Sequence, residues 1–171
     1  MVDDLAPEQF GVCRPGGMEA IIHAVRYWVE SLTCLKDCCI LQLDFRIAFK
    51  TLSRSHILLI LRDSPDSLCH YANVFCNGPL TLYGHGLKRL FLFFCVFYAG
   101  VQQGDHCGPL LFALGIQPLL RQLSALNIEV RFYLDNGILY GKSKLLAQAL
   151  YLIKAFGVKT SMFPSANYGT K

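Results

Sequence analysis

Two carboxylates at the ends of predicted strands are the clearest candidates for chemistry. Asp44 ends an apolar strand, Cys39 to Phe45, and Asp135 lies at the tip of a patterned hairpin. On neighbouring strand ends the two would repel each other unless a cation lay between them. Oxygen ligands with room for phosphate suit Mg²⁺, and two such ions can stabilise a phosphoryl displacement. The alternative is structural: Asp135 forms a turn and Asp44 caps a strand end.

The elements that must position these acids alternate along the chain. Apolar periodicity predicts an α+β domain, in which a sheet carries helices on one face. Expected helices are 18–35, 53–61, 66–75, 109–126 (interrupted by Gly115 and Pro118) and 143–156, and expected strands are 39–45, 128–134 and 138–140. Ser53 is a plausible N-cap. Residues 77–103 suggest short strands and turns, and Asp135, Asn136 and Gly137 suggest a hairpin turn.

Composition excludes several classes of protein. The 171 residues are 53% hydrophobic and 16% charged, which excludes a disordered tail, a collagen-like repeat and a coiled coil. A net charge of +4 is compatible with a polyanionic partner. The longest apolar run, Leu90 to Val101, is too short for a membrane span, which needs about 20 residues. We therefore expect no membrane partner.

The N-terminus and the cysteines bear on the compartment. The first residues, MVDDLAPEQF, have neither the basic nor the apolar stretch of a secretory signal, so the protein is not expected to be secreted. The eight cysteines are expected to be reduced, and no paired spacing predicts a zinc site.

Four sequence blocks, in order, carry a resemblance. They are QFGVCRPGGMEAIIHAVR from residue 9, LQLDFRIAFKTLSR over 41–54, GVQQGDHCGPLLFAL over 100–114 and FYLDNG over 132–137. Together they resemble the reverse transcriptase domain of non-LTR retroelements, an RNA-directed DNA polymerase of mobile elements. The resemblance implies an antiparallel palm sheet with helices on one face and a partial fingers segment. It divides this single partial domain into a fingers–palm connection (1–38), a palm (39–156) and a loosely ordered tail (157–171).

The resemblance also implies a catalytic set. Asp44 and Asp135 would bind two Mg²⁺ ions (Mn²⁺ being a substitute), with the backbone carbonyl of Phe45 as a further ligand. Asn136 occupies the place of a second adjacent aspartate. The asparagine removes a negative charge but keeps a carbonyl oxygen, so the expected result is weakened activity.

Further positions are implied for substrates. Phe49 would lie under the incoming sugar and exclude a 2′-OH, and Tyr133 would pack near the primer end. Gln103 and Gly104 would line the template and nucleotide pocket. The implied partners are an RNA template, a DNA primer and deoxynucleoside triphosphates. The family's need to reach chromosomal DNA implies the nucleus or the cytoplasm as the location. The missing fingers and thumb of a parent polyprotein are expected to complete the enzyme. Arg46, Lys50 and Arg54 either contact phosphates or form a solvated helix face.

Two alternatives stay open beside a polymerase. One is a catalytically inactive remnant of a retroelement that retains at most nucleic-acid binding. The other is a P-loop nucleotide-binding protein, because the sequence from Asn136 to Ser143 nearly matches GxxxxGKS.

Overall fold

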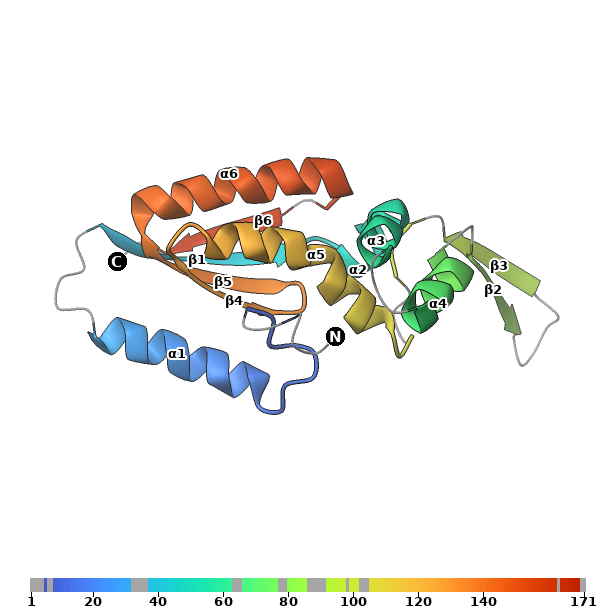
Figure 1. Ribbon diagram of the computed structural model, residues 1–171, viewed down its shortest axis with the longest axis horizontal. Helices are drawn as coiled ribbons and strands as arrows, with labels where there is room; N and C mark the ends of the chain where they lie inside the picture. Colours follow the sequence, from blue (N-terminus) through green and yellow to red (C-terminus); the bar gives the residue numbers. More distant parts are fainter. Residues whose placement is uncertain are drawn as a thin grey trace.

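The computed structural model describes residues 5, 8–31, 37–62, 66–76, 80–85, 92–97, 99–101, 105–162 and 164–169. Figure 1 labels its helices and strands in chain order. They are α1 (Gly17–Ser31), β1 (Cys38–Phe45), α2 (Ala48–Thr51), α3 (Arg54–Leu61), α4 (Asp66–Cys76), β2 (Leu80–His85), β3 (Leu92–Phe97), α5 (Gly108–Ser124), β4 (Glu129–Tyr133), β5 (Asn136–Lys142), α6 (Ser143–Thr160) and β6 (Pro164–Gly169).

A four-stranded antiparallel sheet forms the centre of the fold. Its strand order is β4-β5-β1-β6, so β1 is an interior strand. Along β1, Leu41, Leu43 and Phe45 are buried, while Gln42 and Asp44 between them are exposed. This period-two pattern gives the sheet one apolar face and one polar face, as the alternating sequence predicts.

The long helices α5 and α6 cover the apolar face. Figure 1 shows both on one side of the sheet and α1 on the other. The helix α5 is buried on most of its surface, including Leu111, Phe112 and Leu119, because it packs against α3, α6 and β4. The helix α1 reaches the polar face through Trp28, whose ring lies 4.9 Å from that of Tyr140. The predicted α+β architecture is confirmed, with α1 as a helix on the second face.

Several helix boundaries differ from the sequence prediction. The helix α5 runs without a break through Gly115 and Pro118, because tertiary burial outweighs their low helix propensity. The described part of α1 ends at Ser31, and the short helix α2 was not predicted at all. The predicted N-cap is confirmed, since the Ser53 hydroxyl accepts a hydrogen bond from the backbone N–H of His56 at 3.4 Å.

The prediction of a loosely ordered tail over 157–171 is wrong for most of that segment. Residues 157–160 continue α6, and β6 adds a strand along β1 in the central sheet. The segment PSANYG has no apolar run, so nothing local marks it as a strand. Its order comes from backbone pairing with β1.

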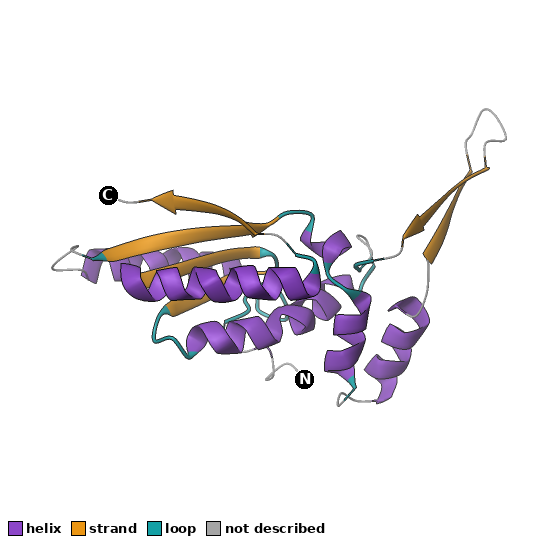
Figure 2. Ribbon diagram, turned by 90° about the horizontal axis from the view of Figure 1, so that it is seen from above, coloured by secondary structure: helices purple, strands orange, loops and turns teal. Residues whose placement is uncertain are grey.

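The region 77–103 contains the predicted strands. Within the described segments, β2 and β3 form a separate two-stranded sheet, and Figure 2 shows this hairpin extending away from the main sheet. Among the described residues, no helix is long and apolar enough to cross a membrane. Among the described residues, Cys13, Cys38, Cys39, Cys69 and Cys107 form no disulfide.

Candidate functional site

Asp44 lies at the end of the interior strand β1, on the polar face of the sheet. Its partner across the β1–β5 ladder is Asn136, and its partner across the β1–β6 ladder is Ser165. The preceding and following residues, Leu43 and Phe45, are buried and hold the strand end against the core. The Asp44 side chain is therefore exposed, while its backbone is held between the neighbouring strands β5 and β6.

Asp135 lies in the loop that joins β4 to β5, directly before Asn136, which pairs with Asp44. The last pair of that hairpin is Tyr133 with Asn136, so the loop consists of Leu134 and Asp135. The predicted turn at Asp135, Asn136 and Gly137 is thus wrong in position, because Asn136 and Gly137 already belong to β5. Leu134 takes the left-handed conformation, with φ at 55°.

Gly137, predicted to form a turn, instead allows close packing within the sheet. A Cβ atom added there would lie 2.5 Å from the ring of Phe132. That ring is fully buried, and its centroid lies 6.4 Å from that of Phe45. Gly137 is therefore needed for close packing inside the sheet. In the sequence alone, an Asn-Gly pair with this role looks the same as an Asn-Gly pair in a turn.

The two carboxylates repel each other. Burial raises the pKa of Asp135, a hydrogen bond from its own backbone lowers it, and the negative charge of Asp44 raises it again. Among the described residues, the ion pairs join Arg26 to Glu30 and Arg131 to Glu129, and neither involves Asp44 or Asp135. Two acids at one end of the sheet, neither of them in an ion pair with a described cationic side chain, form a donor set that fits a divalent cation.

Asn136 and Phe45 are the predicted site residues next to these acids in the sequence. Within the described part of the chain, no three His, Cys, Asp or Glu side chains gather as a metal site. The exposed Asn136 side chain donates a weak hydrogen bond of 3.4 Å to Asp135 Oδ1. Phe45, predicted to offer its carbonyl, has a buried ring and follows Asp44 directly, so its backbone is held at the same strand end.

Phe49 lies one short turn beyond β1, in α2. Its half-buried ring stacks on Phe112 with centroids 4.6 Å apart. Its backbone carbonyl accepts a hydrogen bond of 2.6 Å from Val101, and a Cβ at Gly100 would lie 2.2 Å from the same oxygen. The segment that leads into the predicted Gln-Gly loop therefore begins beside Phe49.

Of the other residues predicted to contact substrates, the structure describes Tyr133. Tyr133 is half-buried in β4, and strand alternation puts it on the polar face with Asp44. Gln103 and Gly104 lie outside the described residues, so their predicted roles stay predictions.

Two interpretations from the sequence fail on the structure. Arg54 is buried and its Nε donates to the Gly100 carbonyl at 2.9 Å, so it is neither a solvated helix residue nor a phosphate ligand. The near match to a P-loop runs along β5 up to Lys142, and the helix starts at Ser143. An extended strand does not wrap phosphate as a P-loop does, so the P-loop alternative is wrong.

Sequence reasoning missed a residue that contacts the loop of Asp135. Gln9 is buried, and its side chain hydrogen-bonds both the N–H and the carbonyl of Leu134. The QFG block contained this signal, but no local pattern connects residues 125 positions apart.

Comparisons with known proteins bear on the fold. The sequence matches no protein-family model and no curated protein. The structure is similar to telomerase from Candida albicans in complex with a fragment of telomeric RNA, with a TM-score of 0.70 at 9% identity over 99% of this chain. It is also similar to apo telomerase from Candida tropicalis truncated from the C-terminal domain, with a TM-score of 0.59 at 9% identity over 90% of this chain.

The likeness covers only part of each neighbour. The chain spans 32% of the Candida albicans chain and 35% of the Candida tropicalis chain. At 9% identity the similarity establishes the fold alone. The chain therefore has the α+β fold of a reverse-transcriptase-like palm.

Proposed function

We propose that this chain is the palm of an RNA-directed DNA polymerase of retroelement type. The observation that carries the proposal is the placement of Asp44 opposite Asn136, with Asp135 in the adjoining loop. The telomerase-like fold supports it, because the Candida albicans neighbour is a telomerase bound to telomeric RNA. The reaction would join a primer 3′-oxygen to the α-phosphorus of a deoxynucleoside triphosphate and release pyrophosphate.

Asp44 and Asp135 would hold two Mg²⁺ ions, or Mn²⁺ in their place, with the Phe45 carbonyl as a further ligand. When bound, such ions stabilise negative charge on the attacking and leaving oxygens. The chain's own contribution is to keep two carboxylates close together although their charges repel each other. Neutralisation of this repulsion favours cation binding at this end of the sheet.

The aromatic residues near the acids suit the recognition of substrate. Phe49 is supported from behind by the buried ring of Phe112, so its position under a deoxyribose would be firm. Tyr133 shares the polar face with Asp44 and would contact the primer end. Gln103 and Gly104 follow the Val101 segment that is bonded to Phe49, and they would line the template and nucleotide pocket.

Asn136 favours a second candidate function. A neutral amide faces Asp44 where a carboxylate would add a third negative charge. The second candidate is a remnant of the same fold that binds nucleic acid without catalysing transfer.

Metal binding and primer extension test the proposal together. We would titrate the full chain with Mn²⁺ and assay extension of a DNA primer on an RNA template with deoxynucleoside triphosphates. Asp44→Asn, which preserves the size of the side chain, should abolish both signals. The matched control is Glu19→Gln, which removes one carboxylate from an exposed position in the first turn of α1 and should change neither.

The outcomes separate the two candidates. Mn²⁺ binding and extension that both depend on Asp44 support the polymerase. RNA binding without extension, even after Asn136→Asp and with fingers and thumb segments supplied, supports the inactive remnant. Mn²⁺ affinity that is the same in Asp44→Asn and in the unmodified chain would refute the site itself.

A further inference from the structure

The segment before α1 lies along the free edge of β4. Gln9 forms an isolated parallel bridge with Phe132. The Phe132 N–H donates to the Glu8 carbonyl at 2.8 Å, and the Phe10 N–H donates to the Phe132 carbonyl at 2.7 Å. Residues 8–10 are therefore fixed to β4 immediately before the loop that contains Asp135.

The Gln9 side chain is directed at that loop. It is only 1% exposed, and its Oε1 accepts hydrogen bonds of 2.9 Å from the N–H groups of Leu134 and Gly11. Its Nε2 donates to the Leu134 carbonyl at 3.4 Å. One buried amide thus holds both backbone polar groups of Leu134.

Leu134 is the residue of the hairpin that needs such support. Its φ of 55° lies in the left-handed region, which a residue with a Cβ adopts only against steric resistance. Favoured two-residue hairpin loops place glycine, asparagine or aspartate at such a position. The hydrogen bonds from Gln9, which lies outside the hairpin, therefore stabilise a backbone conformation that the residue type at position 134 does not favour.

Gly11 makes this approach possible. A Cβ on residue 11 would lie 2.6 Å from the Leu134 backbone nitrogen and 2.7 Å from its Cγ. The glutamine and the glycine of the QFG block therefore have one shared use: close contact with the loop between β4 and β5.

We propose that Gln9 is a positioning residue that sets the direction of the Asp135 carboxylate by holding Leu134 in its left-handed conformation. This inference rests on the proposed function of Asp44 and Asp135 as cation ligands. Gln9 itself touches neither acid in any hydrogen bond of the described residues. Its effect on cation binding passes through the backbone of Leu134.

The test uses the full chain and Mn²⁺ as the probe. In Gln9→Asn the amide is retained but is too short to reach Leu134, and in Gln9→Leu the polar group is lost. Both variants should weaken Mn²⁺ binding by about 10- to 100-fold, the usual cost of losing a group that orients a metal ligand. The Leu134 amide should also exchange its hydrogen faster, which is measured by NMR without any metal.

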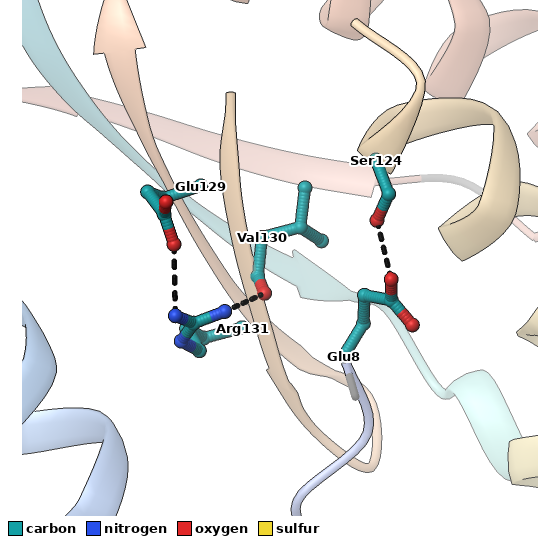
Figure 3. A network of polar contacts seen from close by, with 5 residues as sticks. All are labelled: Glu8, Ser124, Glu129, Val130 and Arg131. Carbon is teal, nitrogen blue, oxygen red and sulfur yellow. Dashed lines mark hydrogen bonds and ion pairs between the residues drawn. The ribbon is translucent and has the colours of Figure 1, made fainter. Parts of the chain in front are cut away.

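A matched control separates positioning from general destabilisation. Glu8 precedes Gln9 in the sequence, but its carboxylate accepts a 2.7 Å hydrogen bond from the hydroxyl of Ser124, the last residue of α5 (Figure 3). Ser124→Ala removes this bond and should lower thermal stability without changing Mn²⁺ affinity. In a Gln9→Asn background, Leu134→Asn should recover part of the affinity, because asparagine accepts the left-handed conformation.

The results distinguish this inference from the proposed function. Unchanged Mn²⁺ affinity in both Gln9 variants, with binding still abolished by Asp135→Asn, overturns the positioning role alone. An equal loss of affinity in Ser124→Ala also overturns it, since general destabilisation then explains the effect. If neither Asp44→Asn nor Asp135→Asn changes the Mn²⁺ affinity, the proposed function is overturned and, with it, this inference.

Discussion

The substitution Asn136→Asp should change the stability of the protein in opposite directions without and with a divalent cation. It places a carboxylate directly across the β1–β5 ladder from Asp44 and next to Asp135 in sequence. Without a cation, the new charge adds repulsion to a pair that already repels. With a cation bound, the same charge becomes an additional ligand.

The magnitude follows from the geometry of the ladder. Side chains directly opposite in an antiparallel pair have Cβ atoms about 5 Å apart. Two unit charges at that separation repel by about 0.8 kcal/mol in water and by about 3 kcal/mol at an effective dielectric constant of 20. Both side chains are exposed, so the lower end applies and we expect a loss of about 1 kcal/mol. For a chain of this size that lowers Tm by about 2–4 °C.

Thermal unfolding in EDTA and in excess Mg²⁺ measures both effects. In EDTA, Asn136→Asp should melt below the unmodified chain. In Mg²⁺, a tenfold gain in affinity would add about 1.4 kcal/mol at saturation, which is enough to reverse the order of the two melting temperatures. The control is Gln148→Glu, which makes the same change of charge at an exposed position in α6.

Two results would refute this reasoning. If Asn136→Asp and Gln148→Glu have the same Tm in EDTA, then a carboxylate at position 136 is not repelled measurably by Asp44. If Mg²⁺ raises the Tm of Asn136→Asp no more than that of the control, then the end of the sheet does not bind the cation as proposed.

Other predictions concern the core. Gly137→Ala should lower the free energy of unfolding by about 1–3 kcal/mol in urea titration, because the new Cβ would meet the buried ring of Phe132; a neutral result would restore the turn interpretation of Gly137. Burial lowers the pKa of His56 below its ordinary 6.5, the Gly115 carbonyl opposes this shift, and the charge of Lys159 adds to it. The unfolded chain therefore binds this proton more readily, so stability should be fully present above about pH 6.5 and fall as the pH drops through the folded-state value. His56→Gln should reduce the fall in urea midpoint between pH 7.5 and 5 (about the range in which histidine titrates), and an unreduced fall would contradict the assignment.

Local patterns predicted the part of the fold that positions Asp44. The alternation in Cys39 to Phe45 identified β1 and its buried face, and the periodic apolar residues after Ser143 identified α6. These elements are readable because burial on one face leaves a regular pattern in the sequence. The sequence also indicated that Asp44 and Asp135 belong together, and the strand register pairs Asp44 with Asn136, the residue that follows Asp135.

Long-range contacts explain what the sequence did not reveal. The strand β6 has no apolar pattern and is ordered by pairing with β1, so its segment was predicted to be loose. The hairpin turn was placed at Asn136 and Gly137 because their residue types favour turns, whereas Leu134 takes the strained position with support from Gln9. Neither contact leaves a trace in the nearby sequence, since each joins segments more than a hundred residues apart.

The position of β1 between two paired strands would affect which ion binds at the proposed cation site. Asp44 projects from a backbone held by β5 on one side and β6 on the other, whereas Asp135 projects from a two-residue loop at the outer hairpin. Any adjustment of the oxygen–oxygen spacing to ionic radius must therefore come from the loop. We expect discrimination between a small ion such as Mg²⁺ and a large one such as Ca²⁺ to be governed by the stiffness of that loop.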